Sequence, residues 1–142
     1  MQNPPPGQPG QPGQPGKSST GLDENVAALL SYIFGWVSGL IFFLIEKDSK
    51  LVRFHAMQSI LFNALIAVVA FVLWVIVFIL MLIGGQLADF LGAIVAVLGT
   101  LLYLAFALGI LIAWVMCLIR AYQGKYFKLP IIGNFAEKFS SK

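Results

Sequence analysis

Apolar residues fill most of the chain between Asn25 and Arg120, in three stretches that short polar segments separate. The stretches cover residues 27–45, 54–83 and 87–119. Each is long enough to cross a hydrocarbon core of about 30 Å, which takes roughly 20 helical residues. Because lipid offers backbone groups no hydrogen-bond partners, we expect the spans to be helical. The pattern predicts an all-α integral membrane bundle of three transmembrane helices, within a membrane domain of residues 23–139.

The third stretch is longer than one crossing requires. A helix over residues 87–119 would be about 50 Å long, so it must tilt, protrude or break near Gly92, Gly99 or Gly109. A break would give four spans, and this alternative stays open at the level of sequence. The composition, 59% hydrophobic and 11% charged, excludes a soluble domain, because so few charges could not cover its surface.

Both ends of the chain differ from the apolar middle. Residues 1–22 contain a Gln-Pro-Gly repeat with no side chains able to form a core, which predicts a disordered tail. The tail has no apolar segment behind a basic start, so we do not interpret it as a signal peptide. Near the C-terminus, Gly124 and Pro130 are expected to end helical runs. After Pro130, residues Ile131, Phe135 and Phe139 recur every four positions and predict a short amphipathic segment at the cytoplasmic interface.

The distribution of basic residues predicts an orientation. Three lie in the first loop, at Lys47, Lys50 and Arg53, five follow residue 119, and the second loop has none. With three spans, the first loop and the C-terminus share one side, which then holds all the basic residues except Lys17. The positive-inside rule makes that side cytoplasmic and the N-terminus external, in the plasma membrane. The net charge of +3 therefore predicts contact with anionic lipid head groups, and no nucleic-acid partner.

A polar stripe opens the second span, where His55, Ser59 and Asn63 recur every four residues and Gln58 lies beside them. Polar side chains inside a membrane face other helices or a water-filled cavity. The stripe is therefore interpreted as interhelical hydrogen bonding or as a cytoplasmic vestibule that binds a ligand. A metal site of His55 with the loop carboxylates matches known ligand spacings poorly. With one histidine and no catalytic motif, we predict no enzyme, cofactor or metal.

Small residues recur every four positions in the first and third spans. Such spacing lets helix backbones approach closely, either within one chain or in a homo-oligomer. The lone cysteine, Cys117, continues the second row and is interpreted as a buried packing residue. The helix-packing candidates are Ser31, Gly35, Gly39, Ala105, Gly109 and Ala113.

Two separated motifs, LIEKDSKLVRFHAMQSIL and AYQGKYFKLPIIGNFAEK, resemble a family of small prokaryotic membrane proteins of unknown function. That family is grouped with the membrane domain of a chloroplast inner-envelope protein-import component, and distant relatives in magnetotactic bacteria are linked to magnetite crystal growth. The resemblance covers residues 23–138, and neither of these roles transfers to this chain on resemblance of fold alone. Its candidate motif residues, with Asn63 added from the polar stripe, are Glu46, Lys47, Arg53, Phe54, His55, Gln58, Ser59, Asn63, Tyr122, Gly124, Lys125 and Pro130.

The two motifs are expected to touch. A short loop joins the second and third spans, so these should form an antiparallel hairpin whose cytoplasmic ends lie side by side. His55 and Gln58 could then hydrogen-bond the backbone around Gly124 and Pro130, and the motifs would form one cytoplasmic collar. The sequence thus predicts a non-enzymatic membrane protein that assembles with itself or a membrane-protein partner. The alternative is a component of a transport or protein-translocation assembly.

Overall fold

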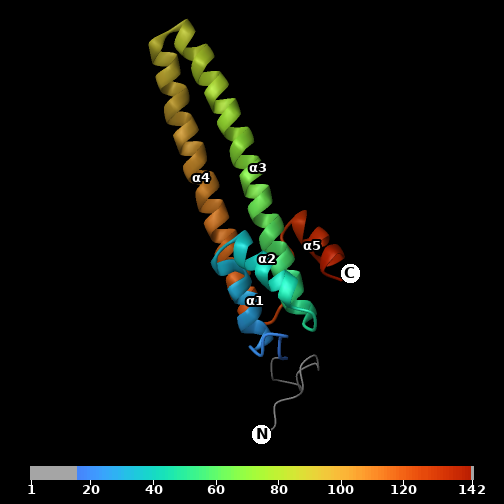
Figure 1. The fold of residues 1–142 in the computed structure, drawn as a ribbon. Coiled ribbons are helices and arrows are strands. Elements are labelled where there is room, and N and C mark those ends of the chain that lie inside the picture. Colours follow the sequence, from blue (N-terminus) through green and yellow to red (C-terminus); the bar gives the residue numbers. More distant parts are fainter. Residues whose placement is uncertain (1–15, 142) are drawn as a thin grey trace. The chain divides into compact units, whose positions relative to one another are not determined.

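The computed structural model describes residues 16–141, so most of the predicted disordered tail lies outside the described residues. Five helices follow one another: α1 (Glu24–Ile33), α2 (Trp36–Ile45), α3 (Lys50–Leu87), α4 (Asp89–Tyr122) and α5 (Ile132–Ser140) (Figure 1). Beyond one isolated bridge, the described part of the chain contains no strand, which confirms the all-α class. The chain divides into a hairpin unit, Leu65–Ile112, and a terminal unit made of the segments on either side of it.

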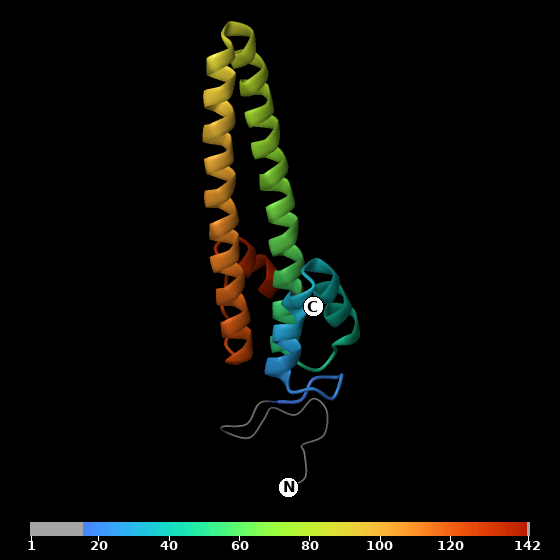
Figure 2. The ribbon, with the colours of Figure 1, turned by 90° about the vertical axis from the view of Figure 1, so that its left-hand side faces the viewer.

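The hairpin unit consists of the second part of α3 and the first part of α4, which lie antiparallel in both ribbon views (Figures 1 and 2). Glycines allow the two helices to approach closely at the turn, where a Cβ on Gly92 would lie 3.3 Å from the Gly85 Cα. Farther from the turn, the Tyr103 hydroxyl donates to the Ala70 carbonyl across the pair at 3.0 Å. The predicted hairpin is therefore present, with close backbone packing.

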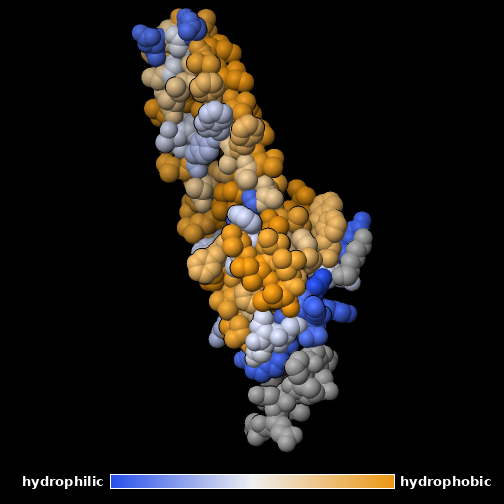
Figure 3. All heavy atoms as spheres, viewed as in Figure 1, coloured by the Kyte–Doolittle hydropathy of each residue, from blue (hydrophilic) through white to orange (hydrophobic). Residues whose placement is uncertain are grey.

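On the face drawn in Figure 3, the hairpin unit is mostly orange and therefore hydrophobic, with blue hydrophilic residues at its tip. Large residues such as Val68, Phe71 and Leu98 are about 60% exposed, an arrangement suited to contact with lipid. The helix α4 is continuous past Gly92, Gly99 and Gly109, so the four-span alternative is not realised. Within the described residues, α3 and α4 are the two helices long and apolar enough to cross a membrane.

The expectation of one spanning helix over residues 27–45 is wrong. The stretch divides into α1 and α2, each of ten residues and therefore only about 15 Å long. Between them Gly35 has a φ of 60°, a left-handed conformation that glycine adopts at little cost. The two helices consequently form a tight hairpin (Figure 2), and neither is long enough to cross the bilayer by itself.

Only some of the predicted helix-packing residues lie at close contacts between helices. In α2, a Cβ on Gly39 would lie 2.8 Å from the Ala56 carbonyl oxygen, so α2 packs against α3 with almost no space between the backbones. Ser31 is buried, but the turn at Gly35 means that the first row does not follow one helix face. In the third span, a Cβ on Gly109 would meet nothing within 4 Å, and Ala105 is exposed. Ala105 and Gly109 therefore lack the predicted packing within the described residues, whereas Ala113, farther along the row, is half-buried.

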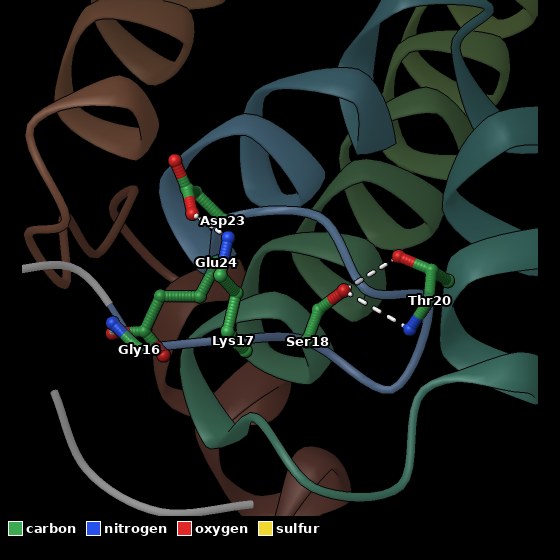
Figure 4. Close-up of polar contacts among 6 residues, drawn as sticks. All are labelled: Gly16, Lys17, Ser18, Thr20, Asp23 and Glu24. Atoms are coloured by element: carbon green, nitrogen blue, oxygen red, sulfur yellow. Dashed lines mark hydrogen bonds and ion pairs between the residues drawn. The ribbon is translucent and has the colours of Figure 1, made fainter. Parts of the chain in front are cut away.

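Residues 16–22, which we expected to belong to the disordered tail, form an ordered turn before α1 (Figure 4). The Glu24 amide donates to the Gly16 carbonyl at 2.9 Å, closing a short antiparallel bridge. The Lys17 ammonium pairs with the Asp23 carboxylate at 2.6 Å, and the Ser18 hydroxyl contacts that of Thr20. Residues 16–22 therefore make defined contacts, and the rest of the predicted tail lies outside the described residues.

At the other end, α4 stops where the sequence indicates. Gly124 has a φ of 69°, the Lys125 amide donates to the Arg120 carbonyl, and the Gly124 amide donates to that of Ala121, both at 3.0 Å. This pair of bonds is the Schellman motif that commonly ends a helix at glycine. The chain then runs without regular secondary structure through residues 125–131, which we call the strap, and enters α5.

Candidate functional site: a buried polar cluster in the terminal unit

His55 lies at the centre of the terminal unit and is fully buried. Its Nε2 is 3.0 Å from the Lys125 carbonyl oxygen, and its Nδ1 is 3.0 Å from the Tyr32 hydroxyl. Because a carbonyl can only accept, Nε2 carries the proton and donates to it. In the neutral ring Nδ1 then accepts from the Tyr32 hydroxyl. The two partners therefore fix the tautomer of His55.

Gln58, one turn farther along α3, completes the cluster. Its side-chain nitrogen donates to the Phe127 carbonyl at 2.9 Å and to the Tyr32 hydroxyl at 3.1 Å. Its side-chain oxygen accepts from the Leu129 amide at 3.2 Å. The buried amide thus holds the strap as a neighbouring β-strand would, by pairing with both a backbone acceptor and a backbone donor. The Cys117 sulfur lies 3.8 Å from the side-chain nitrogen of Gln58, and Cys117 is buried, as predicted.

The predicted contact between the two sequence motifs is present in this geometry. His55 and Gln58 come from the first motif, and their backbone partners at Lys125, Phe127 and Leu129 come from the second. The contact uses the backbone of the strap, so the Lys125 side chain remains exposed. We refer to Tyr32, His55, Gln58 and the strap backbone as the buried cluster.

The rest of the polar stripe holds the turn between α1 and α2. The Ser59 hydroxyl donates to the Gly35 carbonyl at 3.0 Å, and the Asn63 side chain packs against Gly35 while donating to the Ser59 carbonyl. Ser38 caps the same turn by accepting from the Phe34 amide at 3.1 Å. Both His55 and Ser59 are fully buried, so the polar stripe has a structural role in the core of the terminal unit.

A second polar centre surrounds Glu46, the buried residue that ends α2. Its carboxylate accepts from the amides of Ser19 and Asp48 at 3.0 Å, from that of Ser49 at 2.9 Å, and from the Ser19 hydroxyl. Burial alone would raise the pKa of Glu46. The donors outweigh burial and hold the pKa below its ordinary value, because they stabilise the charged form.

Arg53 connects this centre to the C-terminus. Its guanidinium donates to the Glu46 carbonyl at 2.8 Å and to the Ser140 carbonyl of α5 at 3.2 Å, and it lies 4.7 Å from the centre of the Phe43 ring. A planar guanidinium can reach three elements in this way because its donors point in fixed, separate directions. The arrangement explains why the motif residue is an arginine, whose role is broader than orientation in the membrane.

Several residues of the site were missed by sequence reasoning. Tyr32 shares a hydrogen bond with each cluster side chain, and the Trp114 indole donates to the Tyr32 carbonyl at 3.2 Å. Ser19 lay in the supposed tail. A tyrosine inside an apolar stretch was the one available signal, because a buried hydroxyl requires a partner. Conversely, Tyr122 is 62% exposed and lies outside the cluster, whereas Phe54 is buried with its ring 5.1 Å from that of His55.

The polar groups of this site already have hydrogen-bond partners within the chain, and this limits the chemistry open to them. Both nitrogens of His55 have partners, and across residues 16–141 every buried side-chain nitrogen or oxygen has at least one. The same residues contain no group of three His, Cys, Asp or Glu side chains that could hold a metal ion. The described arrangement therefore favours a role in joining chain segments through hydrogen bonds over a role in binding a ligand.

Comparisons with known proteins agree with a membrane protein. Residues 22–136 match the Magnetosome magnetite crystal formation protein family. A UPF0132 membrane protein of Methanocaldococcus jannaschii is 40% identical over 127 residues, which cover 87% of this chain and 94% of the relative. A UPF0132 membrane protein of Archaeoglobus fulgidus is 36% identical over 117 residues, covering 82% of this chain and 95% of the relative. No solved structure matches significantly.

Proposed function

The chain belongs to the family of small prokaryotic membrane proteins that includes its UPF0132 relatives, and from that premise we propose that it is a two-span protein of the plasma membrane with both termini in the cytoplasm. Its terminal unit is a non-catalytic platform at the cytoplasmic face, where it meets anionic lipid and assembles with itself or a membrane-protein partner. What membership of the family supports for this chain is residence in a membrane.

The observation that carries the topology is a set of hydrogen bonds within the terminal unit. Ser19 of the N-terminal turn bonds to Glu46 beside the first loop, and His55 of α3 bonds to the strap that follows α4. A bilayer cannot lie between groups that are 3.0 Å apart. These bonds support a topology in which the N-terminal turn, the first loop and the C-terminal strap share one side of the membrane, and we propose it in place of the expected external N-terminus.

The charges indicate which side this is. All nine Lys and Arg residues lie outside the hairpin unit, which contains only the acidic Asp89 among its charged residues. The positive-inside rule places the basic side in the cytoplasm. With two spans the rule has no exception, whereas the three-span prediction left Lys17 outside.

A platform agrees with the buried cluster better than a transport path does. A path lined by His55, Ser59 and Asn63 would need polar groups open to a passing substrate. In the structure His55 and Ser59 are fully buried and bond to the chain, so a path would require this core to open. The relation to a plastid import component stays a prediction from the sequence resemblance.

Impermeant thiol labelling in intact cells tests the topology. Single cysteines would replace the exposed residues Thr20, Gln86 and Ser141 in a Cys117→Ala background. We expect the reagent to label Gln86→Cys in intact cells, and Thr20→Cys and Ser141→Cys only after permeabilisation. The Cys117→Ala parent is the control for background labelling. Labelling of Thr20→Cys but not Gln86→Cys in intact cells would contradict the two-span proposal.

A further inference from the structure

We infer that α5 and the turn before it insert into the cytoplasmic leaflet, with an apolar row of Ile131, Phe135 and Phe139 among the lipid acyl chains and Lys128 and Lys138 at anionic phosphates. This inference rests on the proposed cytoplasmic position of the terminal unit. It assigns a lipid-binding surface to the segment that Arg53 ties to α3.

Large apolar residues are exposed on α5 and the turn before it. The buried face of α5 consists of Ile132 and the three small residues Gly133, Ala136 and Ser140. Three large apolar residues lie outside this face, with Ile131 72%, Phe135 52% and Phe139 44% exposed. A contiguous apolar row of this kind, bordered by polar residues, is characteristic of an interaction surface.

The backbone before α5 holds the first residue of this row in a strained conformation. Ile131 has φ 70° and ψ −63°, and the Ile132 amide donates to the Pro130 carbonyl at 2.8 Å. This is the γ-turn of positive φ, which is rare and unfavourable for a β-branched residue. Its effect is to turn the Ile131 side chain away from the protein. Such strain persists where the surrounding structure enforces it, and it often marks a functional segment.

Basic residues accompany the apolar row. A Cβ on Gly133 would lie 2.6 Å from the Lys128 Cβ, so the absence of a side chain there lets the strap cross α5 in direct contact. Lys128 is thereby held beside the helix, where it pairs with Glu137 at 2.7 Å, the one acidic residue of α5. Lys138 lies in the last turn and Lys125 is exposed at the start of the strap. The net charge of this surface is positive.

Lipid is the occupant that these features favour over a second copy of the chain. The apolar spans bring the terminal unit to the bilayer, and amphipathic helices with basic borders bind anionic leaflets through acyl-chain and phosphate contacts together. A symmetric pairing of two such surfaces would instead bring the lysines of both copies close together, which is unfavourable.

Site-directed spin labelling of the full chain in phosphatidylglycerol and phosphatidylcholine vesicles tests the inference. A nitroxide on Phe135→Cys, in a Cys117→Ala background, should be accessible to oxygen and protected from a water-soluble nickel chelate. The matched control is Asn134→Cys, an exposed neighbour outside the apolar row, whose nitroxide should be open to the chelate. Phe139→Cys repeats the measurement independently of any local effect at position 135.

Two results would overturn the inference. Equal exposure of positions 134, 135 and 139 to nickel would mean that α5 lies in water. Dipolar broadening at position 135 that disappears on dilution with unlabelled protein would mean that a second copy covers the row. Neither result depends on the labelling of Gln86→Cys and Thr20→Cys, so failure of the topology and failure of the lipid surface can be told apart.

Discussion

Replacement of Gln58 by leucine tests whether the buried cluster attaches the strap to the transmembrane helices. The substitution keeps a side chain of similar size but removes a donor and an acceptor. The Phe127 carbonyl and the Leu129 amide each lose their Gln58 partner, while the Tyr32 hydroxyl keeps its bond to His55. We therefore expect the strap to detach locally, with little change in the helices.

The magnitude follows from the two orphaned backbone groups. Each buried group left without a partner costs about 1–3 kcal/mol, so the loss is at least about 2 kcal/mol before any apolar gain from leucine. A loss of 2 kcal/mol changes an opening equilibrium by about 30-fold, since 1.4 kcal/mol corresponds to a factor of ten. This is a considerable fraction of a total stability of about 5–15 kcal/mol.

Hydrogen–deuterium exchange of detergent-solubilised protein measures the opening. In Gln58→Leu, peptides that cover residues 125–133 should exchange roughly 30-fold faster than in the wild type, with the hairpin unit unchanged. The control is Gln123→Leu, the same chemical change at an exposed position just before the strap. If the two variants exchange alike over residues 125–133, the cluster does not hold the strap and the reasoning fails.

Two further substitutions test the packing and the electrostatics of the terminal unit. Gly39→Leu should lower the thermal midpoint in detergent strongly, because its Cβ would lie 2.8 Å from the Ala56 carbonyl oxygen, whereas Leu40→Ala at a 40% exposed position should change it little; equal midpoints would contradict the close crossing. The lowered pKa of Glu46 stabilises the fold above its ordinary value of 4.5, and this contribution is lost as the pH falls through the folded-state pKa. Glu46→Gln should therefore be less stable than the wild type at pH 7 and approach it at pH 3, and a constant difference in midpoint across that range would refute the assignment.

The parts of the fold that the sequence predicted depend on local rules. The end of α4 at Gly124 follows from the left-handed conformation that a glycine permits. The face shared by His55, Ser59 and Asn63 follows from the helical period. The contact between the two motifs was predicted from the short loop between the second and third spans, because two helices joined by a short loop are expected to lie antiparallel.

The division of residues 27–45 could not be predicted in this way. Hydropathy adds side-chain transfer energies and takes no account of backbone direction, so a turn made of apolar residues scores as a span. The turn persists because its backbone groups find partners: the Phe34 amide donates to Ser38, and the Gly35 carbonyl accepts from Ser59, 24 residues away. The second of these partners comes from α3, and no window over residues 27–45 contains it.

The proposed two-span topology also accounts for the one irregularity in the charge count. The positive-inside rule assigns a side to each loop, and a change of one crossing reverses every segment before it. Only the N-terminal segment precedes residues 27–45, so in the two-span proposal only Lys17 changes side and joins the other basic residues. In the structure Lys17 pairs with Asp23 in the same turn as Ser19, which bonds to Glu46 next to the basic first loop. On the two-span proposal, a single basic residue opposed to all the others is therefore the sequence signal that residues 27–45 do not cross the membrane.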